Sequence, residues 1–118
     1  MPSLDMSGPY DLKESVVSRI ITARTPGNFA VGYVKENGAF ITRFVGRSDS
    51  DVAAELRKQD ADGSTKFKWS SAPSAKAAFD KQCRNFHEFG GYDALENEEH
   101  PEPPRGMNWK CPFCEDLG

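Results

Sequence analysis

The sequence predicts a small α+β domain: a three-stranded, mainly antiparallel sheet flanked by helices, in the order α-β-β-α-β-α. Two observations carry this prediction. Residues 29–45 show a hairpin pattern that is apolar on both faces, and helical spacing of apolar residues occurs on either side of it. A sheet that is apolar on both faces needs cover on both sides. The length of 118 residues suits one domain with a modest core.

The elements before the hairpin are a loose start and a helix. Residues 1–9 are rich in Pro, Gly and Ser, which favours an irregular start to the chain. A single α/β core is expected over residues 10–89. Its first helix has apolar residues at helical spacing, and Pro26-Gly27 ends the segment. These apolar residues are Leu12, Val16, Val17, Ile20 and Ile21.

The hairpin prediction rests on Asn37-Gly38, because both residues tolerate positive φ in a tight turn. A loop of these two residues places Tyr33 opposite Thr42, Val31 opposite Phe44, and Phe29 opposite Gly46. The pairing predicts two apolar faces. One face carries Phe29, Val31, Tyr33, Phe40 and Phe44, and the other carries Ala30, Gly32, Val34, Ile41 and Val45.

The second half of the core alternates helix, strand and helix. Ser50-Asp51 is expected to cap a short helix that contains Val52 and Leu56. Residues 66–71 alternate and predict the third strand. Pro73-Ser74 starts a longer helix that Gly90-Gly91 ends. Its apolar stripe is Ala75, Ala78, Phe79, Cys83 and Phe86. Residues 90–118 are expected to form an acidic, Pro-rich tail.

Composition restricts the classes of function and the location. A formal charge of −3 argues against broad electrostatic binding to nucleic acid, although it leaves room for a local basic groove. No segment approaches the roughly 20 apolar residues that span a bilayer. The first residues have neither the basic flank nor the apolar run of a signal peptide. Three cysteines fit a closed disulfide framework poorly. We therefore expect an intracellular, cytoplasmic protein that is not bound to membranes.

Cys111-Pro112-Phe113-Cys114 provides two thiolates at the spacing of a zinc knuckle. Cys83 and His87, four residues apart on the predicted helix, provide two more ligands on one face. The sequence thus predicts a structural Zn²⁺ that pins the tail to the core, with His100 as an alternative to His87. Binding of a structural zinc is worth on the order of 10 kcal/mol, enough to offset the ordering of a tail. A redox pair and inert thiols remain the competing interpretations.

The segments P26-G27-N28-F29 and F44-V45-G46-R47-S48, followed by a helix, a strand and a helix, resemble the GIY-YIG nuclease domain over residues 26–89. The resemblance implies a small antiparallel sheet flanked by helices. It places the family's two tyrosines at Phe29 and Phe44, its arginine at Glu55, and its metal-binding glutamate at Asp80. Tyr33 is an alternative position for the first tyrosine, and Arg57 lies two residues from the arginine position.

All four positions carry a residue that differs from the family pattern, and each difference changes the chemistry that the position can perform. Phenylalanine lacks the hydroxyl needed to relay a proton. Glutamate in place of arginine sets a negative charge where a phosphodiester would lie. Aspartate still binds Mg²⁺, but with a shorter reach. Compensating candidates are Tyr33, Arg43, Arg47 and Arg57 around Asp80. The alternative is that Asp80 only pairs with Lys76 one turn away.

Three functions follow from these observations. The first is a nucleic-acid-binding module for DNA or RNA, in which cations contact phosphates and exposed aromatic residues stack on bases. The second is an interaction module for a protein partner, using the acidic tail or a sheet face. The third is an active metal-dependent endonuclease built on Asp80. The cations of the first interpretation are Arg43, Arg47, Arg57, Lys66 and Lys68.

Overall fold

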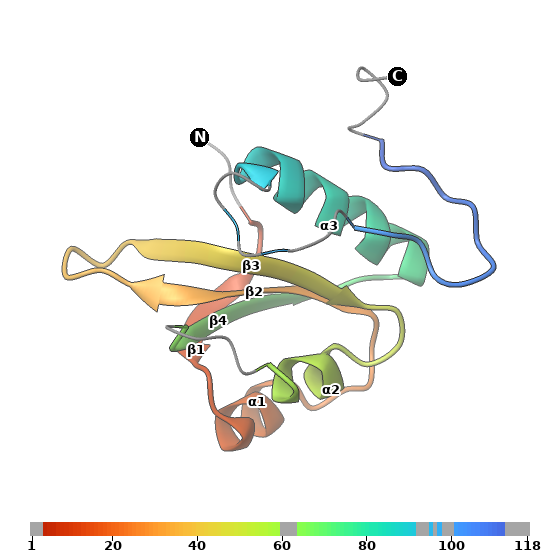
Figure 1. Ribbon diagram of the computed structural model, residues 1–118. Coiled ribbons are helices and arrows are strands. Elements are labelled where there is room, and N and C mark those ends of the chain that lie inside the picture. Colours follow the sequence, from red (N-terminus) through yellow and green to blue (C-terminus); the bar gives the residue numbers. More distant parts are fainter. Residues whose placement is uncertain (1–3, 60–63, 92–94, 96, 98–100, 113–118) are drawn as a thin grey trace.

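The computed structural model describes residues 4–59, 64–91, 95, 97 and 101–112. All neighbouring strands pair antiparallel in one sheet of order β1-β4-β2-β3. Helices α1 and α2 cover one face of this sheet and α3 covers the other, as predicted (Figure 1). The elements are β1 (Ser7–Asp11), α1 (Glu14–Ile20), β2 (Gly27–Val34), β3 (Phe40–Ser48), α2 (Val52–Arg57), β4 (Lys66–Ser71) and α3 (Ala75–Glu88).

The sheet has four strands, so the prediction of three was wrong. The additional strand, β1, lies in the segment that we expected to be loose and pairs with β4. Its main apolar contact is Tyr10, whose ring centroid lies 5.5 Å from that of Phe67. A strand that contains Gly and Pro and packs mostly through its backbone shows no alternating apolar pattern. The sequence therefore gave no signal for it.

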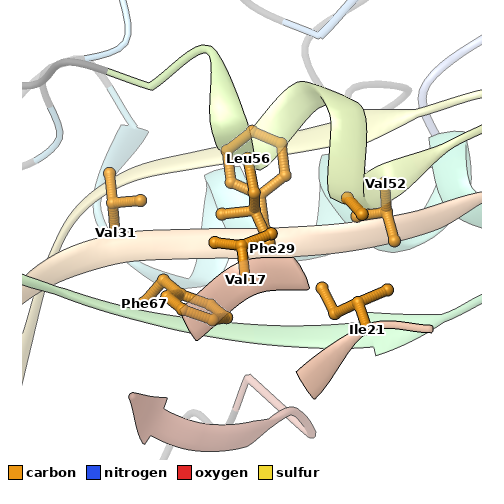
Figure 2. Packing of buried hydrophobic residues seen from close by; sticks show 8 residues of the cluster. Val17, Ile21, Phe29, Val31, Val52, Leu56 and Phe67 are labelled. Carbon is orange, nitrogen blue, oxygen red and sulfur yellow. The ribbon is translucent and has the colours of Figure 1, made fainter. Parts of the chain in front are cut away.

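The larger core lies between the sheet and α1/α2 (Figure 2). Val17 lies on α1 and Ile21 directly follows this helix, whereas Val52 and Leu56 lie on α2. All four side chains are buried. They pack on sheet residues Phe29, Val31 and Phe67. Burial of each large side chain contributes about 1.5–3 kcal/mol. Asp51 caps α2 by accepting a hydrogen bond from the Ala54 N–H at 3.2 Å, as the sequence predicted.

The second core lies between the sheet and α3. Ala30 and Val45 pack with Phe86, and Leu4 and Leu95 close the cluster. Ser74 caps α3 by accepting a hydrogen bond from the Ala77 N–H at 3.1 Å. Helix α3 is 14 residues long. In the described part of the chain no helix combines the length and apolar character that crossing a membrane requires.

The hairpin loop has three residues, 36–38, instead of the two that we predicted. The Lys35 N–H donates to the Ala39 carbonyl and the Gly38 N–H to the Lys35 carbonyl, both at 2.9 Å. Gly38 has φ of 90°, the left-handed conformation that ends such loops. This loop places Tyr33 opposite Ile41, one residue away from the predicted register.

A bulge in β3 then restores the predicted register. The pairing shifts between Val31 and Gly32, so Arg43 is an extra residue between Thr42 and Phe44. Val31 faces Phe44 and Phe29 faces Gly46, as predicted. Because one residue moves a side chain to the other face, Phe40 packs with the α3 core instead of the Phe29 face.

Candidate functional site

The positions that the nuclease resemblance assigns to the tyrosines and the arginine lie on the α1/α2 side of the sheet. Phe29 and Phe44 stack with ring centroids 6.2 Å apart, and Phe29 is only 2% exposed. Glu55 on α2 forms an ion pair with Lys58 at 3.6 Å. Arg57, at the end of the same helix, is exposed. The two phenylalanines therefore serve the core.

Asp80 lies on α3, on the opposite side of the sheet from Arg57. Its carboxylate accepts hydrogen bonds from the Lys76 ammonium at 3.0 and 3.2 Å, as the alternative interpretation of Asp80 expected. Among the proposed compensating residues, Arg47 contacts α3. Tyr33 follows Phe29 and Val31 on the other face. The sheet thus stands between Asp80 and two of its proposed partners.

Arg47 connects β3, α3 and the tail. Its Nη1 donates to Gln82 Oε1 at 2.6 Å, and its Nη2 to the Glu102 carbonyl at 2.5 Å. Its Nε donates to Asp49 at 2.9 Å, and the guanidinium lies 5.1 Å from the centroid of the Phe79 ring. Each guanidinium nitrogen is engaged within the protein. Arg47 is therefore an anchor of the tail more than a contact for an external phosphate.

The tail is attached to the core through the Asn97 carboxamide and the Trp109 ring. Asn97 accepts a hydrogen bond from the Val45 N–H at 3.1 Å and donates to the Val45 carbonyl at 2.8 Å. This carboxamide satisfies the outer edge of β3 as a neighbouring strand would. Further along, the Trp109 ring lies 5.9 Å from the Phe79 ring. Nothing in the sequence pattern singled out Asn97.

The predicted zinc ligands are placed in part. Cys83 is fully buried on α3, His87 lies one turn further along, and Cys111 is half-buried in the segment after Trp109. Cys114 and the alternative ligand His100 lie outside the described residues. Within the ranges that the structure describes, no three His, Cys, Asp or Glu side chains gather closely enough to hold a metal ion.

The charged outer side of α3 is largely paired. A shallow cavity of about 420 Å³ lies there, bordered by Asp5, Ala77, Asp80, Lys81, Arg84 and Pro112. Lys81 donates to the Asp5 carbonyl at 2.7 Å and to Ser70 Oγ at 2.8 Å. Burial, and secondarily the Arg84 charge, lower the pKa of Lys81. Arg84 in turn pairs with the Asp5 carboxylate at 2.9 Å.

The free end of the β2–β3 hairpin differs from the outer side of α3. It extends beyond the helices on both faces of the sheet (Figure 1). Here the Arg43 guanidinium lies 6.0 Å from the centroid of the half-buried Tyr33 ring. A shallow hollow of about 550 Å³ lies beside it, bordered by Tyr33, Val34, Lys35, Glu36 and Asn37.

A second cation–aromatic pair lies on the α3 side of the hairpin. The Lys68 ammonium is 5.2 Å from the centroid of the Phe40 ring. The ring covers Gly32, where a Cβ would lie 3.3 Å from Phe40 Cζ. Such pairs are worth about 0.5–1 kcal/mol at exposed sites. The three-residue loop places Phe40 on this face, and the bulge at Arg43 ends the shifted register. A glycine inside a strand pattern is the signal that could have indicated the bulge.

Charge is distributed unevenly along the chain. Residues 1–91 contain 13 Lys and Arg against 11 Asp and Glu, whereas residues 92–118 contain 2 against 7. The core is therefore slightly basic although the protein is acidic.

We define the hairpin end as Tyr33, Lys35, Glu36, Phe40, Arg43, Lys66 and Lys68. Within this surface, Lys66 donates a hydrogen bond to Asp11 and thereby lowers the pKa of the Asp11 carboxyl.

Comparisons with protein-family models, with curated proteins and with solved structures found no match.

Proposed function

We propose that the protein is a nucleic-acid-binding module without nuclease activity, and that the hairpin end is its contact surface. The observation that carries the proposal is the contact of the Arg43 guanidinium with the half-buried Tyr33 ring, on the hairpin whose free end extends beyond the helices (Figure 1). Cations attract phosphates, and an aromatic face stacks on any base for about 1–3 kcal/mol.

The distribution of charge supports this surface over the others. The hairpin end carries four cations, Lys35, Arg43, Lys66 and Lys68, and its one acidic residue is Glu36. Of these cations, Lys66 pairs with Asp11, as Arg84 pairs with Asp5 on the α3 side of the sheet. Arg47 is held by the tail. The overall charge is acidic because of residues 92–118, so it does not argue against a local basic surface.

The proposal excludes catalysis on chemical grounds. Phe29 and Phe44 have no hydroxyl to activate water. The only acid that the family pattern offers to a divalent metal, Asp80, pairs with Lys76 and is separated from Arg57 by the sheet. A metal-bound phosphodiester at Asp80 would therefore lack an arginine from α2.

A binding titration against single-stranded and duplex DNA and RNA, with Mg²⁺ present and over a range of salt, tests the proposal. The wild-type affinity should fall steeply with salt. Arg43→Gln/Lys68→Gln should weaken binding and reduce the log–log salt slope by about 0.7 for each lost phosphate contact on a single strand.

Arg105→Gln/Lys110→Gln is the matched control, because it removes the same charge from exposed positions in the tail. It should leave binding nearly unchanged. Equal losses in the two double variants would contradict the hairpin assignment. Mg²⁺-dependent cleavage that disappears in Asp80→Ala would contradict the lack of nuclease activity.

We also propose that a structural Zn²⁺ strengthens the attachment of the tail, held by Cys83, Cys111, Cys114 and either His87 or His100. Cys111 lies between Trp109, which contacts Phe79 on α3, and Pro112, which borders the cavity on that helix. The support is this placement together with the knuckle spacing. Binding would draw the Cys111 segment closer to Cys83.

Metal analysis of the purified protein tests the zinc proposal. Cys114→Ser should lower the bound zinc from about one equivalent to nearly none. Cys83→Ser should do the same while also loosening the tail. Unchanged metal content in both variants would overturn the assignment.

A further inference from the structure

We propose that the hollow at the tip of the hairpin selects an unpaired guanine base, which stacks on Tyr33 while the Glu36 carboxylate accepts hydrogen bonds from its Watson–Crick edge. This inference rests on the proposed nucleic-acid-binding function and adds a base preference to it. It is carried by the composition of the hollow, in which one aromatic ring, one carboxylate, one ammonium and one carboxamide border the same space.

The hollow has a defined shape because hydrogen bonds fix the loop that forms it. Two backbone bonds close the turn between Lys35 and Ala39, and the Ala39 N–H also donates to Asn37 Oδ1 at 3.0 Å. These bonds fix the backbone that carries Glu36 and the position of the Asn37 carboxamide. Its volume of about 550 Å³ falls within the range of small-molecule sites and leaves room for a base.

Tyr33 supplies the stacking surface. It is half-buried at the end of β2, and Arg43 lies against its ring. An arginine beside an aromatic ring offers two stacking planes and a positive charge for the adjoining phosphate. Phe40 does not border this hollow, and its ring lies on the α3 side, where it packs with the second core.

Glu36 supplies the discrimination between bases. An ionised carboxylate only accepts hydrogen bonds, and it accepts two in parallel. Guanine alone presents two adjacent donors, N1–H and the N2 amine, on its Watson–Crick edge. Adenine and cytosine present one amine beside a ring acceptor, and thymine and uracil present one N–H between carbonyls. Lys35 borders the same hollow and is a donor suited to guanine O6.

The recognised strand must be unpaired. In a duplex the Watson–Crick edge is occupied and the ring faces are stacked, so neither contact can form. The proposal thus commits to single strands, loops or ends as the ligand. A duplex that competes as well as a single strand would contradict it.

Fluorescence anisotropy with short thymidine oligonucleotides tests this proposal. Four probes carry guanine, inosine, adenine or cytosine at one central position. The wild type should bind the guanine probe about fivefold more tightly than the others, the ratio that one additional hydrogen bond of ordinary strength gives. Inosine is the decisive probe, because it differs from guanine only by the N2 amine.

Three variants assign the effect. Glu36→Gln should bind all four probes alike, because a carboxamide donates as well as accepts. Glu88→Gln, the same change at an exposed position on α3, should keep the preference. Tyr33→Leu should weaken binding to every probe. Equal affinity of the wild type for guanine and inosine, or a preference that persists in Glu36→Gln, overturns this inference alone. Failure to bind any probe at low salt overturns the proposed function as well.

Discussion

Gly46 is the residue on which the packing of Phe29 depends. A Cβ at this position would lie 2.4 Å from Phe29 Cζ and 2.8 Å from Cε1. The ring is buried between β3 and the helices, so it has little room to move away. Gly46→Ala should therefore lower the free energy of unfolding by about 1–3 kcal/mol, measured by chemical denaturation.

A second substitution separates this steric effect from a general preference for glycine. Leucine lacks the distal ring carbons that an added Cβ would meet, so Phe29→Leu should cost less in the Gly46→Ala background than in the wild type. The two changes are thus expected to be strongly non-additive. Strictly additive costs would show that the contact does not limit the packing.

The ion pair between Asp11 and Lys66 leads to a pH-dependent prediction for a single residue. Its hydrogen bond from Lys66, and then the charge of that lysine, lower the pKa of the carboxyl below its ordinary value of 3.8. The ion pair therefore contributes fully above pH 3.8, and its contribution is lost as pH falls through the lowered pKa. NMR titration should show this low pKa, and Lys66→Gln should return it toward the ordinary value. An unchanged pKa in the variant would contradict the pairing.

At the scale of elements, Asn97 replaces a missing strand at the outer edge of β3. Asn97→Ala would leave the N–H and carbonyl of the fully buried Val45 without these partners. The expected cost is about 1–3 kcal/mol, with faster hydrogen exchange at the Val45 amide. Asn108→Ala, the same change at an exposed position in the tail, should have almost no effect on either measurement.

The hairpin shows how much of the pairing between β2 and β3 could be predicted from the sequence. A two-residue loop at Asn37-Gly38 predicted that Phe29 faces Gly46 and Val31 faces Phe44, and both pairs are confirmed although the loop is one residue longer. The loop and the bulge were missed because each shifts the register by one residue and the two shifts cancel. Gly32 carried the information: a Cβ there would lie only 1.8 Å from the Ile41 carbonyl oxygen, so the bulged ladder needs a glycine.

At the scale of the molecule, the sequence predicted that helices cover both faces of the sheet. It did not predict which residues form the candidate binding surface. Apolar residues on both strand faces required helices on both sides, and the helices are there. The contacts that each cation makes depend on the tertiary structure. Arg47 and Arg43 look alike in the sequence, yet the tail engages the first, while the second lies against Tyr33 beyond the helices.

The same dependence explains why Asn97 and β1 escaped prediction. Each acts through backbone hydrogen bonds to a distant strand, and such pairing leaves no local period in the sequence. The pinned tail was expected, and its described contacts include the Leu95 side chain, the Asn97 amide, the Glu102 carbonyl and the Trp109 ring. Ligation of zinc by the cysteines remains a prediction in addition to these contacts.

The most direct test of the hairpin as the binding surface is NMR mapping of backbone amides during titration with a guanine-containing single strand. Our account predicts shifts concentrated at residues 32–43 and 66–68, with the α3 amides around Asp80 unaffected. Shifts centred on Asp80 and Arg47 would instead place the ligand on the α3 side and contradict the account. A spectrum that does not change at all would contradict nucleic-acid binding itself.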